Sequence, residues 1–493
     1  MTGARILCLL LVAALCATTI EAAENWTYGS SEHFEVYTTG DAAKARDALN
    51  YFERIHAFFS EELKIAPKTQ TPMRLIVFSS DREFAPYRPN ERAAAYYQPG
   101  PDRDYIVIGS LDAESYPIVV HEYWHLVVRH LGVAELPPWM SEGWAEYYST
   151  IEPRGDSIAV GRASLGRLQE LSRSGTLMPL DRLLAVRRES PEYNDERQMS
   201  QLYAQSWALV HMLLAGKDYV QQAPTFLRLM LAGTDSATAI VSAYGRPLER
   251  VAADLEDYVR SDRFQFRVFD YQFPKAAKDL KTRPATSFEA RLATANLRAA
   301  TISGEDDARA AFAQLEREDE AHLELQESIA TFEYGRGHWE AAEPHYARAV
   351  ALGSSNWRIF RDYADGVSDA TRRLELLETS LKLNPNDLDV RLRFADGLVR
   401  ADRHQQASSV LASVKEVDRS RAFFFFQLSA VAHASSGRME SARSAAARAV
   451  TFAESSEEKS FASSLVARLT ASRSAPPTTE RSQESRGGAH WQQ

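Results

Sequence analysis

The sequence predicts two folded parts: an α+β N-terminal domain with a small sheet and a mostly helical second half, and then an all-α solenoid of helical repeats. Three observations support this prediction. The chain has 493 residues, which is too long for one compact domain. Short strand-like segments alternate with helical patterns before residue 150. From about residue 285 the composition shifts to Ala, Leu, Glu and Arg in helices joined by short turns.

The strand and helix patterns of the N-terminal part come in a clear order. Apolar runs of strand length lie at 34–37, 73–78 and 105–108, and an amphipathic helix is expected over 41–63. These elements form a small sheet that precedes a buried helix beginning at Pro117 and ending before Gly132. Later helices are expected near 160–172, 199–215, 222–232 and 247–262, and the aromatic stretch 264–273 closes the domain, which spans 24–275.

The buried helix carries the segment His-Glu-Tyr-Trp-His, which has the pattern HExxH. Residues four apart share one helical face, so His121 and His125 can direct ring nitrogens at one metal ion. Glu122 lies beside them, where it can hold and deprotonate a water at the metal. The alternative is a pair of core histidines satisfied by ordinary hydrogen bonds.

A second helix supplies candidates for the remaining positions of such a site. Pro138 can open this helix, and its aromatic composition indicates that it is buried. Glu142 and Glu146 share one face, so Glu142 can be the third ligand while Glu146 accepts the second ring N–H of a ligand histidine. Gly143 has no side chain and lets the two helices approach closely. The alternative is that both glutamates are solvated.

These segments, HEYWH followed by PPWMSEGWAEYY, resemble the gluzincin zinc peptidases, and in particular the peptidase MA-like domain of exported bacterial proteins. The looser resemblance covers residues 26–265. It implies a zincin-like fold, Zn²⁺ held by His121, His125 and Glu142, and Glu122 as general base. Because the aminopeptidase motif Gly-Ala-Met-Glu-Asn is absent, the resemblance favours an endopeptidase.

Two parts of such a site stay open. Gluzincins stabilise the oxyanion with a Tyr or His from a later helix, and here Tyr203 and His211 are both candidates, although either can equally be a packing residue. A substrate-binding edge strand should precede the metal helix, and either 93–97 or 105–108 can supply it.

The region 285–470 resembles tetratricopeptide repeats. The small residues Ala342, Ala407 and Ala442 recur in matching frames at spacings near one or two repeats of 34 residues. Such repeats stack into a solenoid with a surface for a protein partner. A helical bundle without repeats is the alternative.

The two ends and the charge complete the prediction. Residues 1–23 read as a signal peptide, with Cys8 and Cys16 both inside it, and 471–493 read as a disordered tail. We therefore expect an exported chain, periplasmic or extracellular and of bacterial type, with no stable membrane span after signal cleavage. The net charge of −10 gives no support for nucleic-acid binding.

Together these features predict an exported zinc metallopeptidase that acts on a peptide or protein substrate. The alternative is a helical-repeat scaffold that keeps the metal-binding fold without turnover.

Overall fold

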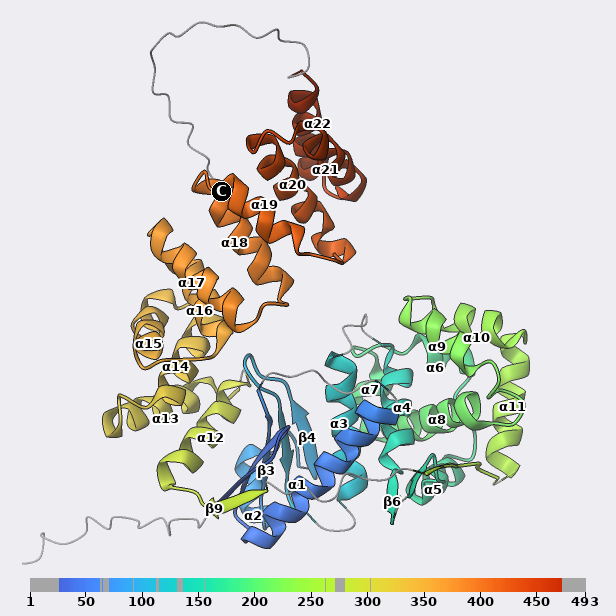
Figure 1. Ribbon diagram of the computed structural model, residues 1–493. Coiled ribbons are helices and arrows are strands. Elements are labelled where there is room, and N and C mark those ends of the chain that lie inside the picture. The colour runs from blue at the N-terminus through green and yellow to red at the C-terminus, as the bar shows by residue number, and fades with distance from the viewer. Residues whose placement is uncertain are drawn as a thin grey trace, which may run out of the picture. The chain divides into compact units, whose positions relative to one another are not determined.

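The computed structural model describes residues 26–62, 64, 71–91, 93–111, 115–130, 136–155, 157–261, 263–270, 280–301 and 303–471 (Figure 1). The chain divides into two compact units, one reaching to Leu315 and the other beginning at Glu316. The predicted signal peptide at 1–23, and all but the first residue of the predicted tail at 471–493, lie outside the described residues.

The N-terminal unit contains a six-stranded mixed sheet in the order β4-β5-β3-β2-β1-β9. Its strands are β1 (Thr27–Ser30), β2 (Phe34–Thr38), β3 (Met73–Val77), β4 (Ala95–Gln98), β5 (Tyr105–Ile108) and β9 (Lys281–Pro284). The central strands β2, β3 and β5 are parallel to one another, and they are the three strands that the apolar runs predict. The outer pairings are antiparallel, so β4 is an edge strand whereas β5 is internal.

Both faces of this sheet are covered, as the continuous apolar runs require. Alternate side chains such as Leu75 and Ile106 face the core shared with helices α1 (Ala42–Ala57) and α3 (Tyr116–His130). The intervening side chains, such as Ile76 and Val107, pack instead with Ala293 and Leu297 of helix α12 (Ser287–Ala299).

The first unit extends beyond the change in composition near residue 285. The sequence places the N-terminal domain at 24–275 and the repeats from 285. Strand β9 pairs with β1, and α12 covers one face of the sheet, so both belong to the first unit. Helix α12 has the Ala- and Leu-rich composition of the repeats, and composition alone does not reveal which surface such a helix covers.

The helical half of the N-terminal unit is built on three central helices, α3, α4 (Pro138–Ser149) and α8 (Glu196–Ala215). Smaller helices surround them: α5 (Leu165–Ser174), α6 (Leu180–Ala185), α7 (Pro191–Asn194), α9 (Ala223–Leu231), α10 (Ser236–Tyr244) and α11 (Leu248–Ser261). The short element η1 (Phe58–Glu62) follows α1, while α2 (Asp81–Phe84) and η2 (Ala85–Tyr87) pack on the sheet face that α12 covers. A second sheet has the order β6 (Glu152–Arg154), β7 (Ser157–Val160) and β8 (Arg267–Asp270).

Gly143 differs in one respect from the sequence interpretation. The sequence predicts that it lets α4 approach the helix α3, which carries the two histidines. The structure places it against α8 instead, where an added Cβ would lie 2.6 Å from Ser206 O and 2.7 Å from Val210 Cγ2. The missing side chain therefore brings α4 close to α8.

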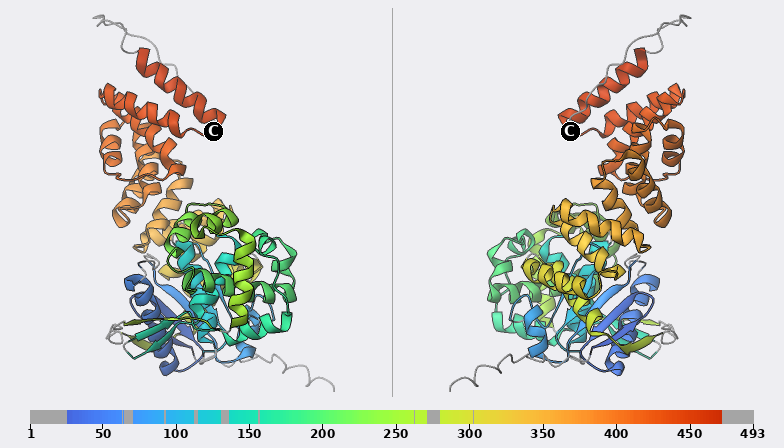
Figure 2. Two further views of the ribbon diagram at one scale, coloured as in Figure 1. Left: turned by 90° about the vertical axis from the view of Figure 1, so that its right-hand side faces the viewer. Right: turned by 90° about the vertical axis from the view of Figure 1, so that its left-hand side faces the viewer.

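The second unit is a helical-repeat array that begins within α13 (Glu305–Glu318). Its paired helices are α14 (Leu323–Gly335) with α15 (Trp339–Ala351), α16 (Trp357–Gly366) with α17 (Ala370–Leu383), α18 (Leu388–Arg400) with α19 (His404–Ala412), and α20 (Arg419–Ser435) with α21 (Met439–Phe452). Helix α22 (Ser456–Ala471) packs on α21. The pairs are joined by short turns and follow one another in chain order (Figure 2).

The spacing of these helices confirms the predicted helical repeats. The first helices of the four pairs begin at residues 323, 357, 388 and 419, so successive starts lie 34, 31 and 31 residues apart. Ala342, Ala407 and Ala442 are completely buried. A small residue at each of these points lets the paired helices approach closely. Among the described residues, no helix has the length and apolar character that crossing a membrane requires.

Candidate metal centre

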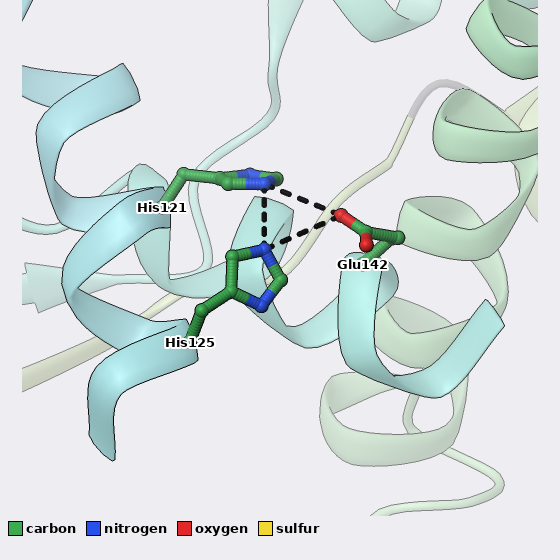
Figure 3. Close-up of side chains that lie close together, drawn as sticks. All are labelled: His121, His125 and Glu142. Atoms are coloured by element: carbon green, nitrogen blue, oxygen red, sulfur yellow. Dashed lines mark hydrogen bonds and ion pairs between the residues drawn. The ribbon is translucent and has the colours of Figure 1, made fainter. Parts of the chain in front are cut away.

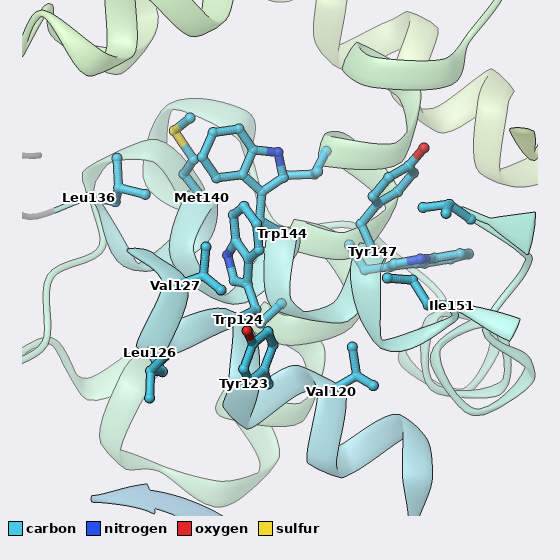
Figure 4. Close-up of a cluster of buried hydrophobic side chains, with 14 of the residues drawn as sticks. Val120, Tyr123, Trp124, Leu126, Val127, Leu136, Met140, Trp144, Tyr147 and Ile151 are labelled. Atoms are coloured by element: carbon cyan, nitrogen blue, oxygen red, sulfur yellow. The ribbon is translucent and has the colours of Figure 1, made fainter. Parts of the chain in front are cut away.

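The two helices of the candidate site are fixed to each other by aromatic packing. Trp124 of α3 contacts Trp144 and Tyr148 of α4, with ring centroids 5.3 Å and 4.5 Å apart. Val120, Tyr123 and Val127 extend the same buried cluster along α3 (Figure 4). Since this packing occupies other faces of α3, the face that carries the two histidines is left for polar contacts with α4.

The structure brings His121, His125 and Glu142 together at one point (Figure 3). The two Nε2 atoms lie 3.1 Å apart, and Glu142 Oε2 lies 3.3 Å from His121 Nε2 and 3.4 Å from His125 Nε2. A tetrahedral zinc ion with ligand atoms at roughly 2.0–2.1 Å holds those atoms roughly 3.3 Å apart. The three atoms therefore have the spacing of ligands around one zinc ion.

The state of Glu142 Oε2 also fits a metal. The carboxylate is 3% exposed, and among the described residues no hydrogen bond of good geometry reaches this oxygen. A buried carboxylate oxygen without a partner is costly. Burial acts to raise the pKa of Glu142, but His125 and His121 hold that pKa well below its usual value. The oxygen is thus an ionised carboxylate oxygen that faces two ring nitrogens, and one cation could bind all three atoms.

The second nitrogens of both histidines have partners of their own. His121 Nδ1 lies 3.1 Å from Glu146 Oε1, in the arrangement that the sequence predicts for Glu146. Arg167 of α5 binds both oxygens of Glu146, with its Nε 2.8 Å from Oε2. Burial raises the pKa of Glu146, but His121 and Arg167 together lower it to about 2. Ser141 Oγ lies 3.4 Å from His125 Nδ1.

Glu122 lies between the metal-binding face and the sheet. Its Oε2 accepts a hydrogen bond of 2.8 Å from the backbone N–H of Tyr97, on edge strand β4. The Tyr97 hydroxyl donates to Asp104 Oδ1 at 2.8 Å, and His130 contacts the other oxygen of Asp104. The pKa of Glu122 is raised above its usual value, because the effect of burial exceeds the opposing effect of His121 and His125. Of the two segments considered for an edge strand, the one containing Tyr97 therefore borders the site.

Two tyrosines lie against the ligands. The ring of Tyr203 stacks on His121 with centroids 6.1 Å apart. Tyr193, on the short helix α7, donates a hydrogen bond of 2.9 Å to Glu142 Oε1 and also interacts with Tyr203. Burial is the largest cause that raises the pKa of both hydroxyls, and Glu142 adds to it. Both groups therefore stay protonated and can donate hydrogen bonds.

His211, the other candidate for stabilising an oxyanion, is engaged elsewhere. Its Nε2 lies 2.7 Å from Gly161 O and its Nδ1 lies 2.8 Å from the Tyr258 hydroxyl. The side chain is completely buried, and that burial lowers the pKa of His211 to about 4. Both ring nitrogens of His211 therefore have partners within the chain, and of the two candidates it is Tyr203 that lies against a ligand histidine.

Sequence reasoning did not find Tyr193, Arg167 or Ser141. Tyr193 lies on a helix of four residues, which has no detectable periodicity. Arg167 is 21 residues from its partner Glu146, and strands β6 and β7 lie between them in the sequence. Ser141 immediately precedes Glu142, and the only available signal was its position inside a buried aromatic helix.

Of the known proteins compared with this chain, only solved structures match it. No family model matches the chain, and no curated protein matches it. Among solved structures, the chain is similar to YrrB, described as a TPR protein with an unusual peptide-binding site, with 19% identity, a TM-score of 0.33, and coverage of 36% of this chain and 91% of that one. It is also similar to MamA from Desulfovibrio magneticus RS-1, with 18% identity, a TM-score of 0.25, and coverage of 31% and 97%.

The resemblance to gluzincin peptidases rests on the sequence motif and on the geometry of the site.

Proposed function

We propose that the N-terminal unit is a zinc-dependent peptidase and that the helical repeats bind a protein partner or the substrate. The peptidase proposal rests on one observation: His121 Nε2, His125 Nε2 and Glu142 Oε2 form a nearly equilateral triangle with sides of 3.1–3.4 Å. Glu122 lies on α3, the helix that carries both histidines. The repeat part rests on the helix pairs.

In this proposal each residue of the site has a separate role. Zinc, when bound, supplies Lewis acidity for a carbonyl group and for water. Glu122, half-buried beside the ligands, would take a proton from the attacking water and pass it to the leaving amine. Tyr203 would donate a hydrogen bond to the developing oxyanion. Edge strand β4 would align an extended peptide through backbone hydrogen bonds.

The test is peptide cleavage by the wild type and by Glu122→Gln. A diverse peptide mixture is incubated with each zinc-loaded protein, and products are mapped by mass spectrometry. We expect cuts by the wild type, and a loss of at least about a hundredfold in the variant with zinc still bound. Equal cleavage by both proteins would refute the role of Glu122.

A second candidate function is a helical-repeat scaffold whose N-terminal unit binds metal without turnover. The repeat architecture favours it, because stacked helix pairs present an extended surface that can bind a protein. The same experiment separates the two functions. Stoichiometric zinc without cleavage of any peptide or partner protein would favour the scaffold.

A further inference from the structure

Helix α20 carries four consecutive phenylalanines, Phe423 to Phe426, that the metal site leaves unexplained. Successive helical residues are about 100° apart, so four of them face nearly every direction around the helix. A repeat helix that packs on its neighbours cannot bury all four. Phe426 is buried, Phe423 and Phe425 are half-buried, and Phe424 is 37% exposed.

The preceding helix α19 is too short to cover this surface. It has 9 residues, whereas the second helices of the other pairs, α15, α17 and α21, have 13, 14 and 14. The missing turn is replaced by the connection at 413–418. A cavity of about 570 Å³ lies there, between the end of α19 and helices α20 and α21. Its apolar lining includes Val417, Phe425, Phe426 and Phe452.

The rim of this cavity carries two cations without carboxylate partners. Lys415 and Arg448 both line it, and neither makes an ion pair with any residue that the structure describes. The guanidinium of Arg448 instead lies 4.0 Å from the centroid of the Phe426 ring. Glu440 is the acidic residue of the lining, and His433, whose pKa burial lowers, is neutral near pH 7. The rim therefore favours an anionic group beside an apolar one.

We propose that this cavity, the α19–α21 groove, binds an acidic segment of a protein partner in which an aromatic side chain is flanked by carboxylates. The aromatic side chain would enter against Phe425 and Phe426. The flanking carboxylates would bind Lys415 and Arg448. The volume lies within the range of about 300–1,000 Å³ that is usual for ligand sites. This site rests on the proposed role of the repeats in binding a protein, lies in the repeat unit alone, and is independent of hydrolysis at the metal centre.

The test is binding of short labelled peptides to the full chain carrying Glu122→Gln, which keeps any probe intact. Fluorescence anisotropy compares fluorescein-labelled Gly-Ser-Asp-Trp-Asp-Ser-Gly with two versions, one with Lys at both Asp positions and one with Ala in place of Trp. Arg448→Glu reverses a rim charge. Ser444→Trp fills the groove from an exposed lining position without cutting into the core. Lys459→Glu, on α22 and outside the lining, is the matched charge control.

We expect the acidic aromatic probe to bind at least about tenfold more tightly than either altered probe. Arg448→Glu and Ser444→Trp should each weaken it by at least about tenfold, and Lys459→Glu should leave it unchanged. Arg448→Glu changes the charge of the rim, whereas Ser444→Trp fills the groove. If one variant fails to fold, the other still tests the proposal. No binding at protein concentrations up to about 0.1 mM, equal binding of the Lys probe, or binding unchanged by both variants would overturn the proposal.

Discussion

Gly143→Ala tests the link between helix packing and the metal centre. An alanine Cβ at this position would lie 2.6 Å from Ser206 O, whereas ordinary contact begins near 3.4 Å. The backbone of α8 cannot rotate out of the way as a flexible side chain can. Helix α4 must therefore move by roughly 0.8 Å, the difference between the two distances, or α8 must yield by a similar amount.

The expected effect has two components. Overpacking of this kind costs about 1–3 kcal/mol, and the better helix propensity of alanine offsets up to about 1 kcal/mol. With the full offset, the N-terminal unit should therefore lose up to about 2 kcal/mol of unfolding free energy. Because Glu142 is the adjacent residue, the same displacement alters a ligand arrangement that tolerates roughly 0.2 Å, and zinc affinity should fall about tenfold or more.

The assay combines urea denaturation with zinc competition against a chromophoric chelator. Gly166→Ala is the matched control, because it lies in helix α5 of the same unit and an added Cβ there meets nothing within 4 Å. The control should be neutral or slightly stabilising, with unchanged zinc affinity. If Gly143→Ala behaved like this control in both measurements, the reasoning about the α4–α8 contact would be refuted.

Three further predictions concern single side chains of the N-terminal unit. Arg167→Gln removes the bidentate partner of Glu146, and should weaken zinc binding about tenfold in the same competition assay, while Arg173→Gln on the same helix should not. Tyr203→Phe keeps the ring stacked on its histidine, and should lower turnover by about 10²-fold or more without loss of zinc; unchanged turnover would remove Tyr203 from the mechanism. Burial lowers the pKa of His56 from 6.5 to about 4, so the unfolded chain takes up the proton first as the pH falls. The unit should lose up to about 3 kcal/mol between pH 6.5 and pH 4, seen as a lower urea midpoint, and His56→Gln should reduce that pH dependence; an identical pH dependence in the variant would contradict the assignment.

The sequence predicts the ligand-bearing helices well because their signals are local. Pro138 begins α4 as expected, and α3 carries both histidines on one face. The four-residue spacings that bring ligands to one helical face depend on helix geometry alone. The three parallel strands are equally well predicted, since a strand buried on both faces must be continuously apolar.

The remaining features depend on which surfaces meet, and no local signal reports that. The glycine at position 143 indicates that another helix approaches closely, but it does not indicate that this helix is α8. Helix α12 looks like a repeat helix but covers the sheet. Tyr193 reaches Glu142 across 51 residues, and the choice between Tyr203 and His211 required knowing the partners of both His211 ring nitrogens.

Metal content tests the central claim most directly. The full chain and the Glu142→Ala variant are incubated with zinc, freed of excess ion by gel filtration, and assayed by inductively coupled plasma mass spectrometry. The proposed ligand set predicts one zinc per chain in the wild type and a loss of most of it in the variant, with both proteins folded by circular dichroism. A folded wild type without zinc, or a variant that keeps a full equivalent, would contradict the assignment of His121, His125 and Glu142 as a metal centre.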